Sequence, residues 1–315
     1  MAKPDLLAVA KPSPFLAPQL AEQFTVHEVP QDHAAFAAIA PRIRAVMGGG
    51  ESRIAAELIA QLPALEIIAI HGVGYDGVDV AAAKARGIPV THTPDVLNDD
   101  VADMALALML GFSRQLVQAD RHVRSGAWEQ GPMPLGRKLT GARLGLVGIG
   151  RIGQRIARRA AAFDMQVAYT ARNPRSELPY TYFPDAAALA ANSDYLVVIT
   201  PGGAGTRKLV DRKVLQALGP NGVLVNVSRG PVVDQDALIE ALETKAIAGA
   251  ALDVFEEEPG VPERLRKLPN VLLSPHIGSA TGATRQAMAD LVAANLRAHF
   301  AGQPLPTPVP ECRQA

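Results

Sequence analysis

One glycine-rich segment constrains the fold of this chain more than any other. Residues 148–153 read Gly-Ile-Gly-Arg-Ile-Gly; they follow the apolar run 144–147 and open the helix-like run 154–163. A strand, a glycine-rich turn and a helix in this order let a dinucleotide pyrophosphate rest on the amides of the helix N-terminus. The alternative is a tight turn that needs glycine only for its backbone. Because the segment lies near the middle of 315 residues, a second structural unit must precede it.

The segments after this turn favour the nucleotide-binding interpretation. Apolar runs suited to strands alternate there with helix-like stretches, which predicts a doubly wound parallel sheet with its ligand crevice at the carboxyl ends of the strands. The expected strands are 143–147, 166–170, 195–200, 222–227, 248–254 and 271–274, and helices are expected at 185–191, 211–218 and 234–242.

The first third of the chain has the same alternation on a smaller scale. Short apolar runs at 6–9, 25–29, 45–47 and 65–70 are separated by helix-like stretches such as 32–40 and 52–62, which predicts a small parallel α/β domain. A long helical pattern follows at 98–124, with acidic residues in its first turn.

The remaining segments suggest that one domain is inserted into the other. Residues 125–138 are rich in glycine and proline and have no periodicity, so we expect an extended arm there. A last helix, 280–300, returns the chain to the first unit. We therefore predict a discontinuous substrate-binding domain, 1–98 with 284–315, and an inserted nucleotide-binding domain, 99–283.

Composition excludes several classes of function. Lys and Arg together number 31, as do Asp and Glu, so no net charge attracts nucleic acid or an anionic membrane. The single cysteine, Cys312, rules out an intramolecular disulfide framework and a cysteine-rich zinc site, and we expect no metal. The apolar run 6–10 is too short for a secretion signal, and no run reaches the roughly 18 apolar residues of a membrane span. We expect a cytoplasmic protein.

The segment after the second expected strand bears on which nucleotide binds. It reads Ala171-Arg172-Asn173-Pro174-Arg175, with two arginines where an NAD-preferring domain usually places an acid on the adenosine ribose. Arginine suits the 2′-phosphate of NADP. The alternative is that both arginines are solvated loop charges.

Three other strand ends carry polar residues suited to hydride transfer. Arg229 follows the strand at 224–227, Glu258 ends the acidic segment 253–258, and His276 follows the strand at 271–274. Reduction of a 2-oxo acid needs a cation for the carboxylate and carbonyl, a proton donor, and a carboxylate to hold that donor. Each residue alone is more often structural; their shared position at one rim favours catalysis.

Several motifs together resemble the D-isomer-specific 2-hydroxyacid dehydrogenases. They are residues 148–153, 226–230, 252–259 and 274–279, and residues 72–79 resemble the substrate loop of that family. Residues 94–103 and 124–128 look closest to its glyoxylate/hydroxypyruvate and hydroxyphenylpyruvate reductases, which typically use NADPH. The resemblance implies two Rossmann-like or flavodoxin-like α/β domains with doubly wound parallel sheets.

The resemblance also implies roles for individual residues. His276 would protonate the carbonyl oxygen with Glu258 as its partner, Arg229 would bind and polarise the 2-oxo acid, and the amides of Val73 and Gly74 would hold its carboxylate. Read without the resemblance, the loop at 72–79 would be an ordinary turn. The implied cofactor-binding residues are Val101, Gly148, Gly150, Arg151, Ile152, Gly153, Ala171, Arg172, Asn173, Thr200, Val227, Asp253, Gly278 and Ser279.

The expected function is NADPH-dependent reduction of small 2-oxo acids to D-2-hydroxy acids, with NADH as the weaker cofactor. We expect a homodimer with a dimerisation arm near 125–140, and Trp128 as a buried anchor rather than a residue that reaches the partner's pocket. Two alternatives are a hydroxyphenylpyruvate or phosphoglycerate type of dehydrogenase and a nucleotide-sensing relative without catalysis. A phosphorylated substrate should require extra cations near 72–76, where only His71 is basic.

Overall fold

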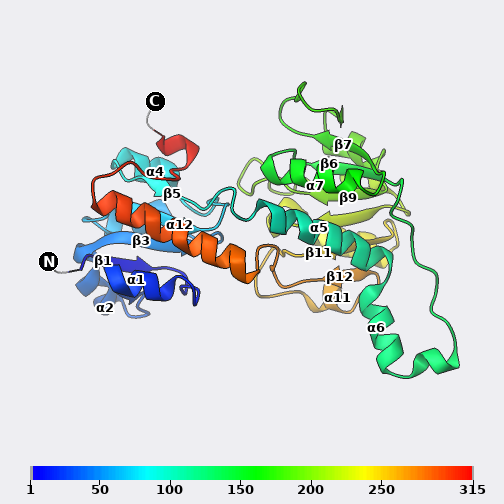
Figure 1. Ribbon diagram of the computed structural model, residues 1–315, viewed down its shortest axis with the longest axis horizontal. Helices are drawn as coiled ribbons and strands as arrows, with labels where there is room; N and C mark the ends of the chain where they lie inside the picture. The colour runs from blue at the N-terminus through cyan, green and yellow to red at the C-terminus, as the bar shows by residue number, and fades with distance from the viewer. Residues whose placement is uncertain (1–2, 314–315) are drawn as a thin grey trace. The chain divides into compact units, whose positions relative to one another are not determined.

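A computed structural model describes residues 3–313, which form two compact units. The first unit contains the chain up to Leu97 and again from Ser279, and the second runs from Asn98 to Gly278 (Figure 1). The sequence analysis set the boundaries after residues 98 and 283, so Asn98 and residues 279–283 fall in the other unit. No helix among the described residues is long and apolar enough to cross a membrane.

The first unit is built on a five-stranded parallel sheet with the strand order β2-β1-β3-β4-β5. This order reverses direction between β1 and β3, as in flavodoxin-like folds. The strands are β1 (Asp5–Ala8), β2 (Thr25–Glu28), β3 (Ile43–Gly49), β4 (Ile67–His71) and β5 (Val90–Thr91).

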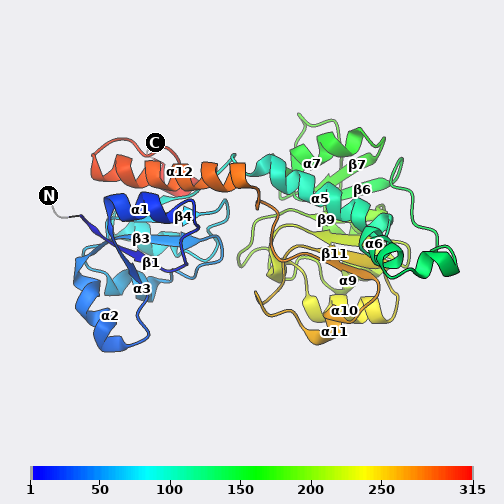
Figure 2. The same ribbon diagram turned by 60° about the horizontal axis from the view of Figure 1, so that its bottom comes forward.

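Helices cover both faces of this sheet, which explains why its strands are apolar on both sides. One core cluster joins Leu7, Val46 and Ile68 to helices α2, α3 and α4, and the other joins the alternate residues of the same strands to α1 and α12. Figure 2 shows α1 and α12 on one side of the sheet and α2 and α3 on the other. The helices are α1 (Ala17–Gln23), α2 (His33–Ile39), α3 (Ala56–Gln61), α4 (Val80–Ala85) and α12 (Gly282–Phe300).

The second unit has a seven-stranded parallel sheet, in the order β12-β11-β10-β9-β6-β7-β8. Its direction reverses between β6 and β9, so the α/β fold with two doubly wound sheets is confirmed. The sequence analysis found six of these strands and missed β8. The strands are β6 (Arg143–Val147), β7 (Gln166–Thr170), β8 (Thr181–Tyr182), β9 (Tyr195–Val198), β10 (Val223–Asn226), β11 (Gly249–Leu252) and β12 (Val271–Leu273).

Aspartate caps fix the start of three helices in this unit. Asp185, Asp211 and Asp234 each accept a hydrogen bond from the backbone amide three residues further on, at 2.8, 3.0 and 3.3 Å. These helices carry the leucines, isoleucines and valines of the core on that face of the sheet. The helices of the unit are α5 (Asn98–Ser113), α6 (Leu116–Arg124), α7 (Arg151–Ala161), α8 (Ala186–Ala190), α9 (Arg212–Leu218), α10 (Gln235–Glu243) and α11 (Glu263–Arg266).

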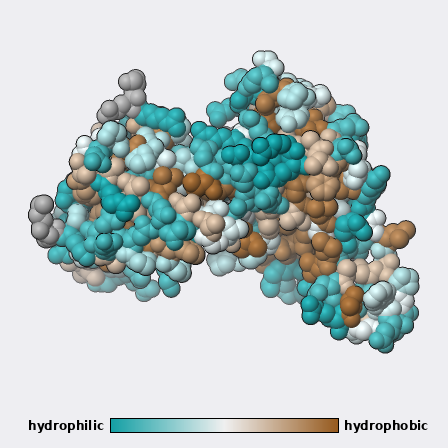
Figure 3. All heavy atoms as spheres, in the orientation of Figure 1, coloured by the Kyte–Doolittle hydropathy of each residue, from teal (hydrophilic) through white to brown (hydrophobic). Residues whose placement is uncertain are grey.

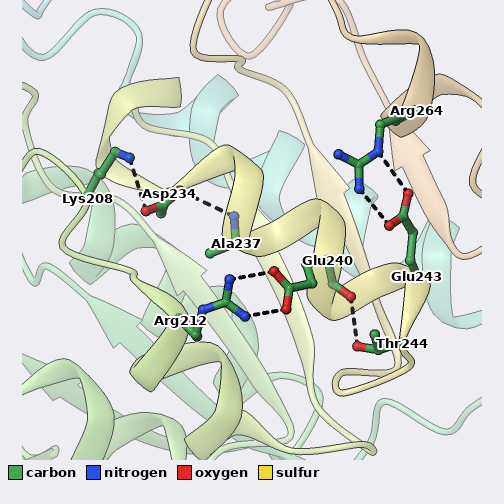
Figure 4. Close-up of polar contacts among 8 residues, drawn as sticks. All are labelled: Lys208, Arg212, Asp234, Ala237, Glu240, Glu243, Thr244 and Arg264. Atoms are coloured by element: carbon green, nitrogen blue, oxygen red, sulfur yellow. Dashed lines mark hydrogen bonds and ion pairs between the residues drawn. The ribbon is translucent and has the colours of Figure 1, made fainter.

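Ion pairs join α10 to its neighbours on both sides. Figure 4 shows Glu240 facing the guanidinium of Arg212 from α9, and Glu243 facing that of Arg264 from α11, at 2.5 and 2.7 Å. Lys208 lies 3.1 Å from Asp234, which also caps α10. Because most of these side chains are exposed to solvent, the ion pairs contribute little to stability, and the apolar core beneath them supplies most of the packing energy.

The prediction of one long helix over 98–124 is wrong. The chain forms α5 and α6, which are separated where Gln115 adopts a left-handed conformation with φ 52°. The hydroxyl of Ser113, at the end of α5, bonds to the carbonyl of Met109 and to the hydroxyl of Tyr195. The last turn of α5 is therefore tied to the sheet, whereas α6 has no residue buried by its own chain.

The arm after α6 also differs from the prediction. Trp128 lies in a short 3-10 helix, η2 (Ala127–Gln130), and is 66% exposed, so within its own chain it is not the buried anchor that we expected. Residues 131–139 continue as extended chain, and Leu135 is 96% exposed. Within residues 3–313 these two side chains therefore stay largely exposed.

Candidate active site

The glycine-rich turn has the geometry of a pyrophosphate-binding loop. Gly148 has φ +106°, and a Cβ there would lie 2.8 Å from the carbonyl oxygen of Ile199. A Cβ at Gly153 would lie 2.6 Å from the carbonyl oxygen of Gly148, so glycine permits the close approach of helix α7 to the turn. A Cβ at Gly150 would meet nothing within 4 Å. That open space lies directly before Arg151 and Ile152, at the N-terminus of α7, where a phosphate would be held.

Two tyrosines hold the ends of the arginine-containing loop after β7. The hydroxyl of Tyr169 accepts a hydrogen bond from the amide of Arg175 at 2.7 Å, and the hydroxyl of Tyr182 lies 3.4 Å from the carbonyl oxygen of Ala171. The two rings contact each other, with centroids 5.5 Å apart. The ends of the loop that carries Arg172 and Asn173 are thereby fixed.

The two arginines of this loop are in different electrostatic environments. Arg175 pairs with Glu177 at 2.5 Å. A hydrogen bond from its own backbone amide, and then this pairing with Arg175, hold the pKa of Glu177 below its usual value. Arg172 is exposed and has no ion pair or hydrogen bond among residues 3–313. Arg172 is therefore the guanidinium that can meet a ligand phosphate.

Strand register brings the three expected catalytic residues to one edge of the sheet. Asn226 pairs with Leu252, and Leu252 pairs with Leu273, so β10, β11 and β12 end side by side. Arg229, Glu258 and His276 each follow one of these strand ends. The first two loops are in direct contact, because a Cβ at Gly230 would lie 1.8 Å from the carbonyl group of Phe255.

His276 and Glu258 form a close pair. Nδ1 of His276 lies 2.7 Å from Oε2 of Glu258, and the other carboxylate oxygen accepts the amide of Phe255 at 2.9 Å. The two side chains keep exposures of 32% and 20%, so the pair is accessible to a ligand. His276 has φ 52°, a left-handed conformation that costs energy for a residue other than glycine and that often marks functional sites.

Asp253 is a buried carboxylate that organises the turn of His276. It is 2% exposed and accepts the amides of Ile277 and Gly278 at 2.9 and 2.8 Å, and the hydroxyl of Ser274 bonds to it as well. Its carbonyl oxygen accepts the amide of His276 at 2.8 Å. These bonds give Asp253 a structural role at this turn, and the cofactor contact that the resemblance implied stays a prediction.

The turn that carries Arg229 is closed by a residue to which sequence reasoning gave no role. Asn226 is 1% exposed; its side chain donates to the carbonyl of Arg229 at 3.0 Å and accepts the amide and hydroxyl of Ser228. Nη1 of Arg229 bonds to the carbonyl oxygen of Ser228 at 2.9 Å. Asn226 and Ser274 were missed because Asn226 acts on a loop backbone and Ser274 on the buried carboxylate of Asp253. Their one sequence signal is a polar residue at the end of a buried strand.

The remaining expected cofactor residues divide between the two units. Thr200 and Val227 follow the strand ends of β9 and β10, and Val101 of α5 lies next to Gly278. Ser279 belongs to the first unit, as do the expected substrate-binding residues Val73 and Gly74.

His71, at the end of β4, directly precedes the expected substrate loop. Burial, together with the nearby charge of Arg285 on α12, lowers the pKa of His71 to about 4. The ring is therefore neutral near neutral pH. The basic residue that sequence analysis noted beside this loop contributes no positive charge there.

Comparison with known proteins agrees with this geometry. Residues 106–278 match the family described as "D-isomer specific 2-hydroxyacid dehydrogenase, NAD binding domain". The chain is 51% identical over 267 residues to glyoxylate/hydroxypyruvate reductase A of Arabidopsis thaliana, covering 85% of each chain. It is 49% identical over 270 residues to hydroxyphenylpyruvate reductase of Plectranthus scutellarioides, covering 86% of each.

A solved structure resembles the whole chain. It is the NADPH-dependent glyoxylate/hydroxypyruvate reductase of Sinorhizobium meliloti in complex with NADP and malonate, with a TM-score of 0.94, 46% identity and 100% of each chain covered. The fold, the glycine turn and these comparisons define an NAD(P)-dependent oxidoreductase that acts on CH–OH groups. The chain belongs to the D-isomer-specific 2-hydroxyacid dehydrogenase family, which confirms the resemblance that its motifs carried.

Proposed function

We propose that this protein reduces glyoxylate and hydroxypyruvate to D-2-hydroxy acids with NADPH. The observation that carries the proposal is the 2.7 Å contact between His276 and Glu258. Arg229 follows a strand that ends at the same edge of the sheet. The names of the Arabidopsis and Sinorhizobium relatives support the substrate class.

The contact with Glu258 indicates which ring nitrogen of His276 faces the substrate. A carboxylate only accepts hydrogen bonds, so Nδ1 carries hydrogen toward Glu258, and Nε2 is the atom that exchanges a proton with substrate. His276 donates this proton to the carbonyl oxygen as the carbonyl carbon is reduced, and Glu258 stabilises the positively charged ring beforehand. Arg229 stabilises the negative charge that develops on that oxygen. Bound NADPH supplies the hydride.

Cofactor preference follows from the loop after β7. Arg172 offers an uncompensated guanidinium for the 2′-phosphate of NADPH, and Glu177 does not oppose it because Arg175 neutralises that carboxylate. NADH lacks the phosphate and gains nothing from Arg172. We propose NADH as the weaker cofactor.

The proposal is tested by the wild-type protein with NADPH or NADH, followed by nicotinamide absorbance. The panel contains glyoxylate, hydroxypyruvate, hydroxyphenylpyruvate and phosphohydroxypyruvate, because one relative is named for the third compound and Arg285 is a cation near the substrate loop. We expect the highest kcat/KM with the first two compounds and NADPH. No turnover of any of the four would refute the reductase, and a preference for NADH would refute the role of Arg172.

A variant separates catalysis from binding in the same assay. His276→Ala should lower kcat by about 10²- to 10⁴-fold, the usual contribution of a positioned proton donor. Its Kd for NADPH, measured by nicotinamide fluorescence, should not change. The matched control is His33→Ala on helix α2 of the first unit, which should keep full turnover. An equal loss of NADPH affinity in His276→Ala would contradict the assigned role.

We further propose that the arm makes the protein a homodimer. Leu116, Val123, Trp128 and Leu135 are exposed large apolar side chains within twenty residues. Figure 3 shows brown, hydrophobic atoms on the surface of this part of the molecule, at lower right. Leu116 and Val123 are seven residues apart and share one face of α6. A nine-residue helix without a core is marginal in water, so this face needs a partner surface. A second copy of the arm offers an apolar surface of the same kind.

A further inference from the structure

The turn after β4 contains two consecutive peptide groups that are both held through their carbonyl oxygens. The amide of Thr93 donates to the carbonyl of Gly72 at 2.9 Å, and Nδ1 of His92 lies 2.9 Å from the carbonyl oxygen of Val73. A carbonyl oxygen only accepts, so Nδ1 carries the hydrogen. Both contacts come from the segment directly after β5, within the first unit.

These contacts set the direction of two amides. The carbonyl of Gly72 and the amide of Val73 belong to one peptide group, and the carbonyl of Val73 and the amide of Gly74 belong to the next. In a trans peptide the C=O and N–H bonds point in opposite directions, so both N–H groups point away from residues 92 and 93. Neither amide donates to another group among residues 3–313. Two adjacent amides that converge in this way bind anions.

The backbone of His92 is itself fixed by the C-terminal segment. Its amide donates to the carbonyl of Thr307 at 3.2 Å, and its carbonyl accepts the hydroxyl of Thr307 at 2.6 Å. Asn295 of helix α12, which is fully buried, bonds to both the hydroxyl and the amide of Thr307, at 2.7 and 3.0 Å.

The imidazole ring of His92 is held as well. The ring of Tyr75 packs edge-on against it at 5.3 Å between centroids, and the hydroxyl of Tyr75 donates to Glu311 at 3.1 Å. His92 is 7% exposed, so water does not compete effectively for its contact with Val73. The ring therefore has one position from which to hold the loop.

We propose that His92 is a positioning residue for the substrate carboxylate. It holds the carbonyl of Val73, and so aims the amide of Gly74, while the backbone of Thr93 does the same for the amide of Val73. The C-terminal residues Thr307 and Glu311 belong to this support. The inference rests on the proposed function and on the role that the family resemblance implies for these two amides, which is to bind the carboxylate of the 2-oxo acid.

Two variants separate the hydrogen bond from the volume of the ring. His92→Phe keeps a ring beside Tyr75 but has no donor, so the Val73–Gly74 peptide can rotate. His92→Asn places an amide nitrogen as many bonds from Cα as Nδ1 is, and restores a donor. One charge-assisted hydrogen bond corresponds to about 10- to 100-fold in affinity, which is the expected increase of KM for glyoxylate in His92→Phe. His92→Asn should recover most of this loss.

The experiment measures three quantities for each variant: KM and kcat with glyoxylate, Kd for oxalate, and Kd for NADPH. Oxalate is a two-carbon anion that cannot be reduced, and its binding is titrated against the protein with NADP bound. The matched control is His27→Phe, since His27 lies on β2 of the same unit and its ring also makes a side-chain hydrogen bond. We expect weaker oxalate binding in His92→Phe alone, with kcat and NADPH affinity retained.

The outcomes distinguish this inference from the proposed function. If the wild type reduces no 2-oxo acid, the proposed function fails, and the oxalate titration still tests the amides. If His92→Phe binds oxalate as tightly as the wild type, the inference on His92 fails alone. Equal losses in His92→Phe and His92→Asn, or an equal loss in His27→Phe, would also overturn it, since they would indicate general destabilisation rather than a lost donor.

Discussion

His71, a half-buried histidine at the end of β4, makes the stability of the protein depend on pH. Burial and the charge of Arg285 lower the pKa of His71 from 6.5 to about 4. Between these values the unfolded chain binds a proton and the native protein does not, so the free energy of unfolding falls as the pH is lowered. The difference between the two pKa values corresponds to at most about 3 kcal/mol of the free energy of unfolding, which is lost as the pH falls from 6.5 to 4.

His71→Gln should remove this dependence. Urea unfolding of the wild type and the variant is followed at several pH values in this range. As the pH falls from 6.5 to 4, the free energy of unfolding of the wild type should fall by up to about 3 kcal/mol relative to that of the variant. The reference is His33→Gln, because His33 is exposed on helix α2. Parallel curves for the wild type and His71→Gln would contradict the prediction.

Some residues of the candidate site could be predicted from the sequence and others could not. Glu258 and His276 could be found because each ionisable side chain follows a strand end, and parallel strand ends meet at one edge. Asn226, Ser274 and His92 could not, because each acts through hydrogen bonds to a loop backbone or a buried carboxylate. The direction of those bonds depends on how the loops close, and no periodicity in the sequence encodes it.

Among the elements, the short strand β8 helps to hold the loop that carries Arg172. Sequence analysis missed β8, whose two residues give no periodic signal, yet Tyr182 on that strand bonds to the carbonyl of Ala171. With Tyr169 at the other end of the loop, the backbone that carries Arg172 is held in place. Arg172 and Arg175 therefore have separate roles although both lie in one loop.

Arginine substitutions in this loop should have unequal effects. Arg172→Ala removes the one guanidinium in this loop that no carboxylate neutralises, and should weaken NADPH binding by about 10- to 100-fold, the range for one charge-assisted contact. Its affinity for NADH should not change. Arg175→Ala, the matched control, removes a charge already paired with Glu177 and should have a much smaller effect. Fluorescence titrations with both nucleotides measure this; equal losses in the two variants would contradict the different roles.

Helix boundaries, like the supporting residues of the site, were not fully predictable from the sequence. The pattern at 98–124 is helical almost throughout, and no proline interrupts it. The chain nevertheless turns at Gln115, because Ser113 is tied to Tyr195 in β9 and α5 ends where the sheet beneath it ends. A tertiary contact of this kind overrides local helix propensity. The strands of both sheets were easier to predict, since each is a short apolar run that is buried on both faces.

At the scale of the whole molecule, the arm is the segment whose apolar side chains stay exposed in a single chain. The helices of the two sheets bury their apolar faces within each unit, whereas α6 buries none of its residues and Trp128 is 66% exposed. Exposed apolar side chains that gather in one segment usually mark an interface. The arm is also where the sequence prediction of a buried Trp128 and the structure of one chain disagree, and a homodimer would reconcile them.

Sedimentation of the wild type should therefore give twice the mass of one chain. Leu116→Ser combined with Leu135→Ser removes two apolar side chains of the arm and should shift the protein toward monomer, because about 25 cal/mol is lost per Å² of apolar surface that stays in water. The control is Val29→Ser, an exposed apolar residue outside the arm. Fluorescence of Trp128, the only tryptophan, should shift to longer wavelength as the dimer dissociates. A wild type that sediments as a monomer, or a double variant that stays a dimer, would place the interface elsewhere or remove it.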